Sequence, residues 1–122
     1  MVKLWSAALC LVACSSTSGT PEDAGTDTGT NGCTDSDFVD ASAITWDFQV
    51  SPRCVHVAVN QTVTWTGDFS VHPLAPLNGD TPNPITSNGA TGSVTIKFPS
   101  SGTFGFHCVN HATMLGAVRV GP

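Results

Sequence analysis

Basic residues are scarce in this chain. Its 122 residues include four lysines and arginines against nine aspartates and glutamates, and the net charge is −5. A protein that binds nucleic acid needs a basic footprint for the phosphate backbone, so this composition excludes nucleic acid as a partner. The acidic residues after position 32 are scattered and predict no acidic patch: Asp35, Asp37, Asp40, Asp47, Asp68 and Asp80.

Helical periodicity is lacking as well. No window supports an amphipathic helix longer than a turn or two, and apolar residues alternate instead with polar ones, as in Ile44, Trp46, Phe48 and Val50. The same period of two recurs in residues 55–59, 63–65, 94–98, 104–108 and 118–120. Gly, Pro, Asn and Asp separate these runs. The pattern predicts an all-β sandwich or barrel.

No apolar run reaches the length of about 20 residues that a membrane-spanning helix needs. Residues 1–13 combine a basic start with a short apolar run, which is typical of a secretory signal peptide. Leu11-Val12-Ala13-Cys14 resembles a bacterial lipobox, and this resemblance implies that Cys14 is lipidated. The alternative is an ordinary signal peptide that is cut elsewhere. An Asp directly after the lipidated Cys is associated with retention in the inner membrane. This chain has Ser15 there, which favours a location of the protein at the outer membrane, facing the periplasm, or at the cell surface.

Residues 14–32 come next. They begin with Cys14, the expected lipidation site, and continue as a segment of mostly Ser, Thr, Gly, Asp and Glu. Such a segment buries too little apolar surface to offset its chain entropy, so we expect a disordered tether. The folded domain is then expected over residues 33–122.

Soft and nitrogen donors gather in one short stretch. Cys108, His111 and Met114 follow one another at Cys-x2-His-x2-Met spacing, and His72 lies in a polar loop upstream, followed by Pro73. Two imidazoles and a thiolate with a weak axial thioether are the ligand set of a mononuclear blue-copper site. We expect His111 and Met114 in the loop after Cys108. The alternative for Met114 is a residue that fills the core.

The sequence around these residues resembles the cupredoxin family, most closely amicyanin in loop length and more loosely plastocyanin. The similar pieces are residues 102–108, residues 114–120, and Gln61–Thr66 with His72 beyond it. The resemblance implies a small Greek-key sandwich with one type 1 copper ion on His72, Cys108, His111 and Met114. It also implies an electron carrier that meets redox proteins transiently, and we expect a monomer.

The cysteines divide by role. Cys10 leaves with the signal peptide, Cys14 takes the lipid and Cys108 is assigned to the metal. Cys33 and Cys54 remain as a disulfide pair in an oxidising compartment. The alternative is that Cys33 lies free in the tether or pairs between molecules.

Two histidines remain outside the proposed ligand set. His56 and His107 alternate away from the apolar faces of their strands, so we expect exposed strand histidines, with a second metal site as the alternative. Leu74, Leu77, Ala112 and Leu115 flank the ligands and predict an apolar collar around His111 for partner docking. The alternative is that Leu74 and Leu77 cap the core.

Three functions compete at this point. The first is a lipid-anchored blue-copper electron carrier. The second is a copper carrier or buffer without redox cycling, which would tend to have the extra Met and His ligands that this chain lacks. The third is a metal-free or zinc-bound surface module. We do not expect an enzyme, because no Ser/His/Asp set or carboxylate pair stands out and copper oxidases and nitrite reductases need further copper centres.

Overall fold

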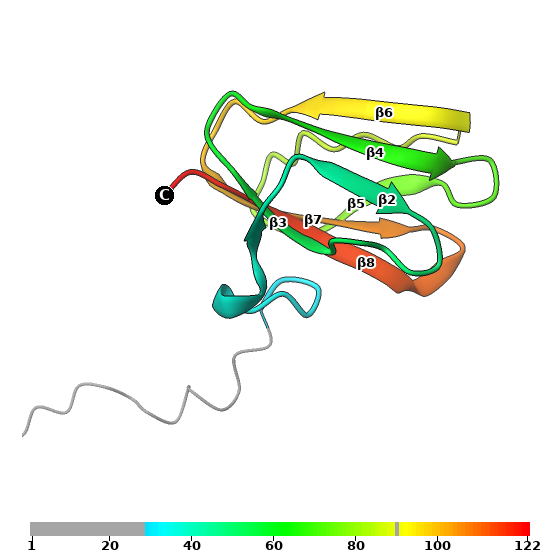
Figure 1. The fold of residues 1–122 in the computed structure, drawn as a ribbon, viewed down its shortest axis with the longest axis horizontal. Coiled ribbons are helices and arrows are strands. Elements are labelled where there is room, and N and C mark those ends of the chain that lie inside the picture. Colours follow the sequence, from blue (N-terminus) through cyan, green and yellow to red (C-terminus); the bar gives the residue numbers. More distant parts are fainter. Residues whose placement is uncertain (1–28, 90) are drawn as a thin grey trace, which may run out of the picture.

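The computed structural model describes residues 29–89 and 91–122, which fold into two β-sheets packed face to face (Figure 1). Along the chain the strands are β1 (Val39–Asp40), β2 (Ala43–Trp46), β3 (Cys54–Val57), β4 (Thr62–Asp68), β5 (Leu74–Gly79), β6 (Thr91–Lys97), β7 (Gly102–Cys108) and β8 (His111–Val120). A short 3-10 turn, η2 (Asp35–Asp37), precedes them. The predicted all-β sandwich is confirmed.

The strand order is β1-β3-β8-β7-β5 in one sheet and β2-β4-β6 in the other. β8 pairs antiparallel with β7, and β7 pairs antiparallel with β5. β3 runs parallel to β8, and β2 runs parallel to β4. Figure 1 shows β4 and β6 as one layer above β7 and β8. The β4–β5 loop and the β7–β8 turn therefore meet at one end of the sandwich, opposite the C-terminus.

The alternating apolar residues fill the space between the sheets. Trp46 and Trp65 come from the smaller sheet and Phe106 from the larger one, and each is at most 1% exposed. The Phe106 ring packs edge-on against both tryptophans, with centroids 5.8 and 5.3 Å away. Fully burying a side chain of this size contributes roughly 1.5–3 kcal/mol, so these three rings are a large part of what joins the two layers.

The alternation fails after β2. The sequence predicts Phe48 on the core face with Trp46, but β2 ends at Trp46 and Phe48 is 60% exposed. Thr45 and Ser51 exchange two backbone hydrogen bonds, of 2.8 and 3.2 Å, which close residues 46–50 into a loop. A closed loop does not keep the strand period of two, so the prediction for Phe48 is wrong.

An N-terminal segment, residues 29–40, lies along the larger sheet. The Cys33–Cys54 disulfide is present, at a sequence separation of 21, so the predicted pairing is confirmed. The side-chain amide of Asn31 donates to the carbonyl oxygens of Leu77, Phe106 and Gly116 at 3.0, 3.3 and 2.8 Å. Asn31 was assigned to the tether from sequence, yet it makes hydrogen bonds to β5, β7 and β8.

Gly105 on β7 leaves the space that the Asn31 side chain occupies against the larger sheet. A Cβ atom at Gly105 would lie 1.9 Å from the Leu77 carbonyl oxygen and 2.5 Å from Nδ2 of Asn31. Both separations are far below van der Waals contact. Only glycine therefore fits at this position.

The predicted signal peptide, the predicted lipidation site Cys14 and residues 15–28 of the predicted tether lie outside the described residues. Within residues 29–89 and 91–122, no helix has the length and apolar character that crossing a bilayer requires.

Candidate metal centre

The loop between β4 and β5 carries His72. Its first turn is held by Asp68, whose carboxylate accepts hydrogen bonds from the hydroxyl and the backbone N–H of Ser70. These bonds, that of the hydroxyl first, hold the pKa of Asp68 below its usual value. The backbone N–H of His72 donates to the Asp68 carbonyl at 3.0 Å. The histidine therefore sits on a closed turn.

Cys108 and His111 flank the turn between β7 and β8. Cys108 ends β7, His111 begins β8, and the two residues pair across Val109 and Asn110. The register of the two strands shifts between His107 and Cys108. The sequence predicted His111 in a loop, but the hairpin extends further, and this position at a strand end brings the imidazole next to the thiol.

The two ligand-bearing segments are joined by hydrogen bonds. The backbone N–H of Val109 donates to the Pro73 carbonyl at 3.0 Å, and the Asn110 side chain donates to the Val71 carbonyl at 3.1 Å. These bonds fix the β4–β5 loop against the β7–β8 turn. His72, distant in sequence, is thereby held beside Cys108.

Three donor atoms converge as a result. Nδ1 of His72 and Nδ1 of His111 are 3.1 Å apart, and they lie 3.8 and 3.5 Å from the Cys108 sulfur. Atoms at these separations can share one ion through bonds of about 2.0 Å to nitrogen and 2.3 Å to sulfur, as in zinc sites. Among the described residues, this is the one group of His, Cys, Asp and Glu side chains with such geometry.

Burial differs among the ligand residues. Cys108 and His72 are 1% and 6% exposed, whereas His111 is half-buried. Met114 was predicted in the loop after Cys108, but it lies within β8, and it is fully buried. A buried thiol and imidazole, a second imidazole nearer to solvent and a buried thioether are the donor types of a type 1 copper site.

The predicted apolar collar is only partly correct. Leu74 is completely buried, so it caps the core, which was the alternative, while Leu77 and Leu115 are half-buried and Ala112 is exposed. The large apolar side chains that are exposed at this end are Phe48, Val71 and Val109, at 60%, 50% and 58%.

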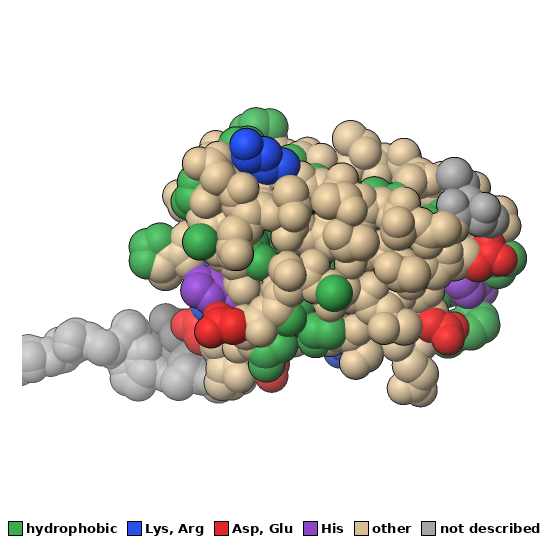
Figure 2. Space-filling model, turned by 45° about the horizontal axis from the view of Figure 1, so that its top comes forward, with side chains coloured by type: hydrophobic (Ala, Val, Ile, Leu, Met, Phe, Trp, Pro, Cys, Tyr) green, Lys and Arg blue, Asp and Glu red, His purple; other side chains and the backbone are tan. Residues whose placement is uncertain are grey.

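Two of the six aspartates after position 32 lie at this end. Asp47 and Asp68 line the same surface depression as Val71 and His72. Figure 2 shows histidine, hydrophobic and acidic side chains together at its right-hand end. The ligand end is therefore apolar with carboxylates beside it.

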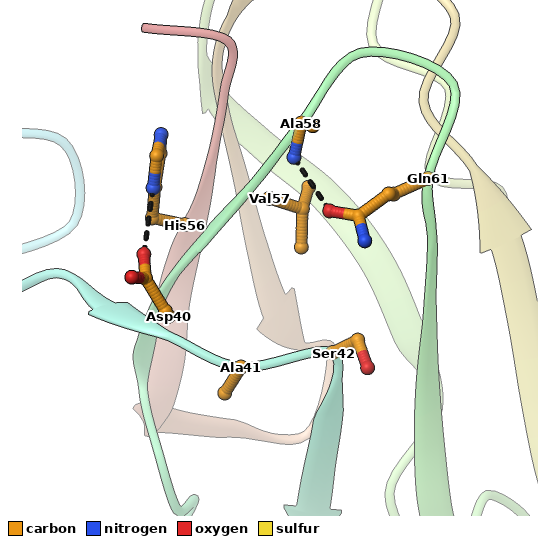
Figure 3. Close-up of a pocket in the computed structure, with 7 residues that line it drawn as sticks. All are labelled: Asp40, Ala41, Ser42, His56, Val57, Ala58 and Gln61. Carbon is orange, nitrogen blue, oxygen red and sulfur yellow. Dashed lines mark hydrogen bonds and ion pairs between the residues drawn. The ribbon is translucent and has the colours of Figure 1, made fainter.

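His56 and His107 lie outside the ligand group. Nδ1 of His56 is 2.8 Å from the Asp40 carboxylate (Figure 3). Nε2 of the same ring contacts the Gly121 carbonyl. Mainly through the hydrogen bond to Asp40, and then through that to Gly121, the pKa of His56 is raised above 6.5. The structure thus places His56 in a polar contact between β1 and the C-terminus. His107 is half-buried on β7.

No family model and no curated protein match this sequence. Solved structures do. A purple cupredoxin from Nitrosopumilus maritimus aligns with a TM-score of 0.53 at 24% identity, covering 66% of this chain and 99% of that one.

The chain has the cupredoxin fold. A copper-containing nitrite reductase from Thermus scotoductus aligns with a TM-score of 0.55 at 18% identity, over 69% of this chain but 23% of the reductase. A methionine-to-alanine mutant of amicyanin in its Cu(I) state aligns with a TM-score of 0.50 at 20% identity, over 66% and 81% of the two chains. These identities establish the cupredoxin fold alone, so the function is argued from the donor set.

Proposed function

We propose that this protein is a blue-copper electron carrier. The observation that carries the proposal is the convergence of Nδ1 of His72, Nδ1 of His111 and Sγ of Cys108 within 4.8 Å of one another. Copper bound by these atoms supplies a one-electron Cu(I)/Cu(II) couple. The buried Met114 is the proposed axial ligand.

The surroundings of the ligands suit electron transfer. The thiol of Cys108 is almost inaccessible to water, while His111 is half-buried and offers a path to the surface. Hydrogen bonds between the two ligand-bearing segments restrict how far the donors move. A ligand set held in place by its supporting contacts needs little rearrangement when the charge of the ion changes.

The surface around His111 favours a transient protein partner. Phe48, Val71 and Val109 are exposed there, with Asp47 and Asp68 close by. Redox encounters typically bury less than about 1,200 Å². A small apolar surface of this kind fits brief contacts of a monomer with an electron donor and an electron acceptor better than it fits a permanent complex.

The decisive experiment is a visible spectrum of the purified protein after copper(II) is added. We expect an intense blue colour from charge transfer between the Cys108 sulfur and Cu(II), and a reversible one-electron wave in voltammetry. Cys108→Ala is expected to lose the colour completely. Its metal-free form is expected to remain folded and to unfold cooperatively, with only the loss of stability that a substitution in the core causes. A colourless wild-type protein that retains zinc instead contradicts the proposal.

We further propose that the domain is held at the bacterial envelope by a lipid on Cys14. The support is the lipobox-like Leu11-Val12-Ala13-Cys14 and the polar composition of residues 15–32. Residues 29–32 belong to the folded part, so fourteen residues, 15–28, are left as the proposed tether. As a flexible chain they have a root-mean-square reach of about 20 Å, which lets the domain turn toward its partners while it stays attached.

Cell fractionation tests the anchor. The wild-type protein is expected in the membrane pellet and Cys14→Ala in the soluble fraction, because one change removes the acyl chains that hold the protein on the bilayer. Cys10→Ala is the matched control, since it keeps the lipobox. Pelleting of Cys14→Ala to the same extent as wild type is the contrary outcome.

A further inference from the structure

Phe48 contacts both imidazoles of the metal centre, although it comes from a segment that supplies no ligand. Its ring centroid lies 4.9 Å from that of His72 and 4.7 Å from that of His111. The interplanar angles are 76° and 71°, so both contacts are edge-to-face. The two imidazoles lie 4.8 Å apart. The three rings therefore form a closed triangle in which each ring contacts the other two.

The Phe48 loop is fixed by bonds of its own. The indole N–H of Trp46, in the buried core, donates to the His72 carbonyl at 2.7 Å. The backbone N–H of Phe48 donates to the Asp47 carboxylate at 2.6 Å. The bond from Trp46 ties the end of β2 to the His72 turn, while the Asp47 bond and the Thr45–Ser51 pair shape the loop that carries Phe48. The phenyl ring is thus placed by the fold of the smaller sheet.

The exposure of Phe48 indicates that the ring has a role other than filling the core. At 60% exposed it is the most exposed of the large apolar side chains in the described part of the chain. A phenylalanine in a core position would bury most of its surface. Here the buried part of the ring faces the two histidines.

We propose that Phe48 is a positioning residue of the metal centre, which holds the His72 and His111 rings in one arrangement by packing against both. The inference rests on the proposed copper function. Edge-to-face ring pairs are favourable beyond the area that they bury, and two such pairs from a single side chain restrict rotation of both imidazoles. His111 depends on Phe48 most, because it is the ligand nearer to solvent.

The chain provides matched variants for a test. Phe48→Leu keeps an apolar side chain at the same place but removes the aromatic ring. Val71→Ala and Val109→Ala remove apolar surface from the same end, at residues that are 50% and 58% exposed. If surface apolarity alone matters, all three variants behave alike. If the ring contacts matter, Phe48→Leu differs from the two valine variants in the NMR signals of the imidazoles and in the rate of copper release.

The first measurement uses the metal-free protein. Proton NMR is expected to show shifts of the imidazole ring protons of His72 and His111 in Phe48→Leu, because the ring current of the phenyl group is lost. Val71→Ala is expected to leave the His111 ring protons close to their wild-type positions. Unchanged imidazole signals in Phe48→Leu overturn the inference, whether or not the protein binds copper.

The second measurement uses the copper-loaded protein. Transfer of Cu(I) to an excess of a chelator is expected to be about tenfold faster in Phe48→Leu, which corresponds to about 1.4 kcal/mol. The two valine variants are expected to stay within about twofold of wild type. Equal release rates in all variants overturn the positioning role while the copper function stands. A wild type that takes up no copper refutes the proposed function instead, and the NMR result then decides the ring contact alone.

Discussion

The ligand end of this protein and its N-terminal segment secure the fold in different ways. The N-terminal segment is joined to the sheet by the Cys33–Cys54 disulfide and by the three carbonyl contacts of Asn31. The ligand end has donor atoms held by hydrogen bonds between two loops, and it exposes Phe48. The covalent link therefore lies away from the proposed ligand residues, which are held by hydrogen bonds alone.

The outer face of the larger sheet shows why this separation is possible. Cys33, Cys54 and Ala117 form a small buried cluster of their own, with Phe38 packed against it. The Arg119 side chain lies 4.0 Å from the centre of the Phe38 ring. On neighbouring positions of β8, Val118 and Val120 face the main core instead. Because successive residues of a strand point to opposite faces, one strand serves the metal centre at its start and both packing layers further along.

The largest expected effect comes from removing the disulfide. Closing a loop of 21 residues is worth about 3 kcal/mol on the loop-entropy model, so replacing Cys33 and Cys54 together by serine is expected to lower the free energy of unfolding by about that amount. Urea unfolding of the metal-free protein measures it. We expect the blue colour of the folded, copper-loaded variant to be unchanged. A shifted visible spectrum would show that the two regions are coupled.

Substitution of Met114 is expected to have the opposite pattern of effects from removal of the disulfide. The reduction potential of the metal centre changes clearly, and the free energy of unfolding changes little. Met114→Gln replaces a soft thioether by a harder amide oxygen, which favours Cu(II) and lowers the reduction potential. Met114→Leu removes the donor and is expected to raise it. Shifts on the order of 59 mV, or about 1.4 kcal/mol, in opposite directions are expected by voltammetry.

The metal-free protein serves as the control for this pair. Because Met114 is fully buried, the exchange for leucine is expected to cost less than about 1.5 kcal/mol of stability. Potentials equal to wild type in both variants would leave Met114 as a core residue and refute its role as the axial ligand.

The smallest expected effect concerns His56, which joins β1 to the C-terminus. Because the pKa of His56 is raised in the folded state, chiefly by the hydrogen bond to Asp40, the protonated ring stabilises the fold. This contribution is complete below about pH 6.5 and is lost as the pH rises through the raised value. For a partly exposed pair we expect less than about 1 kcal/mol.

Urea unfolding of the metal-free protein at several pH values tests this contact. His56→Gln is expected to remove the loss of stability above pH 6.5, and Asp40→Asn to reduce it, because the contact of His56 with the Gly121 carbonyl remains. The double variant is expected to add nothing beyond His56→Gln. A wild-type pH dependence retained in both single variants would contradict the assignment. The copper spectrum is expected to stay the same in all three.

Much of the fold was predictable because the alternation of apolar residues reports burial directly. It placed Ile44, Trp46 and Phe106 in the core correctly. It failed at Phe48, because the pairing of Thr45 with Ser51 ends the strand and no local signal of that pairing stands in the sequence. Asn31 was missed for a related reason, since its partners are backbone carbonyls of three strands that only the folded sheet brings together.

The sequence by itself determined the donor types and the order of the strands that carry them. A thiol, an imidazole and a thioether at fixed short spacing belong to one hairpin, and local geometry is enough to group Cys108 with His111. The resemblance named His72 as the second imidazole, and the tertiary structure places it beside Cys108 and His111. Only the tertiary structure showed that Phe48 packs against both imidazoles. Those contacts join the two sheets across long sequence separations, and they depend on how the sheets pack, which no short segment encodes.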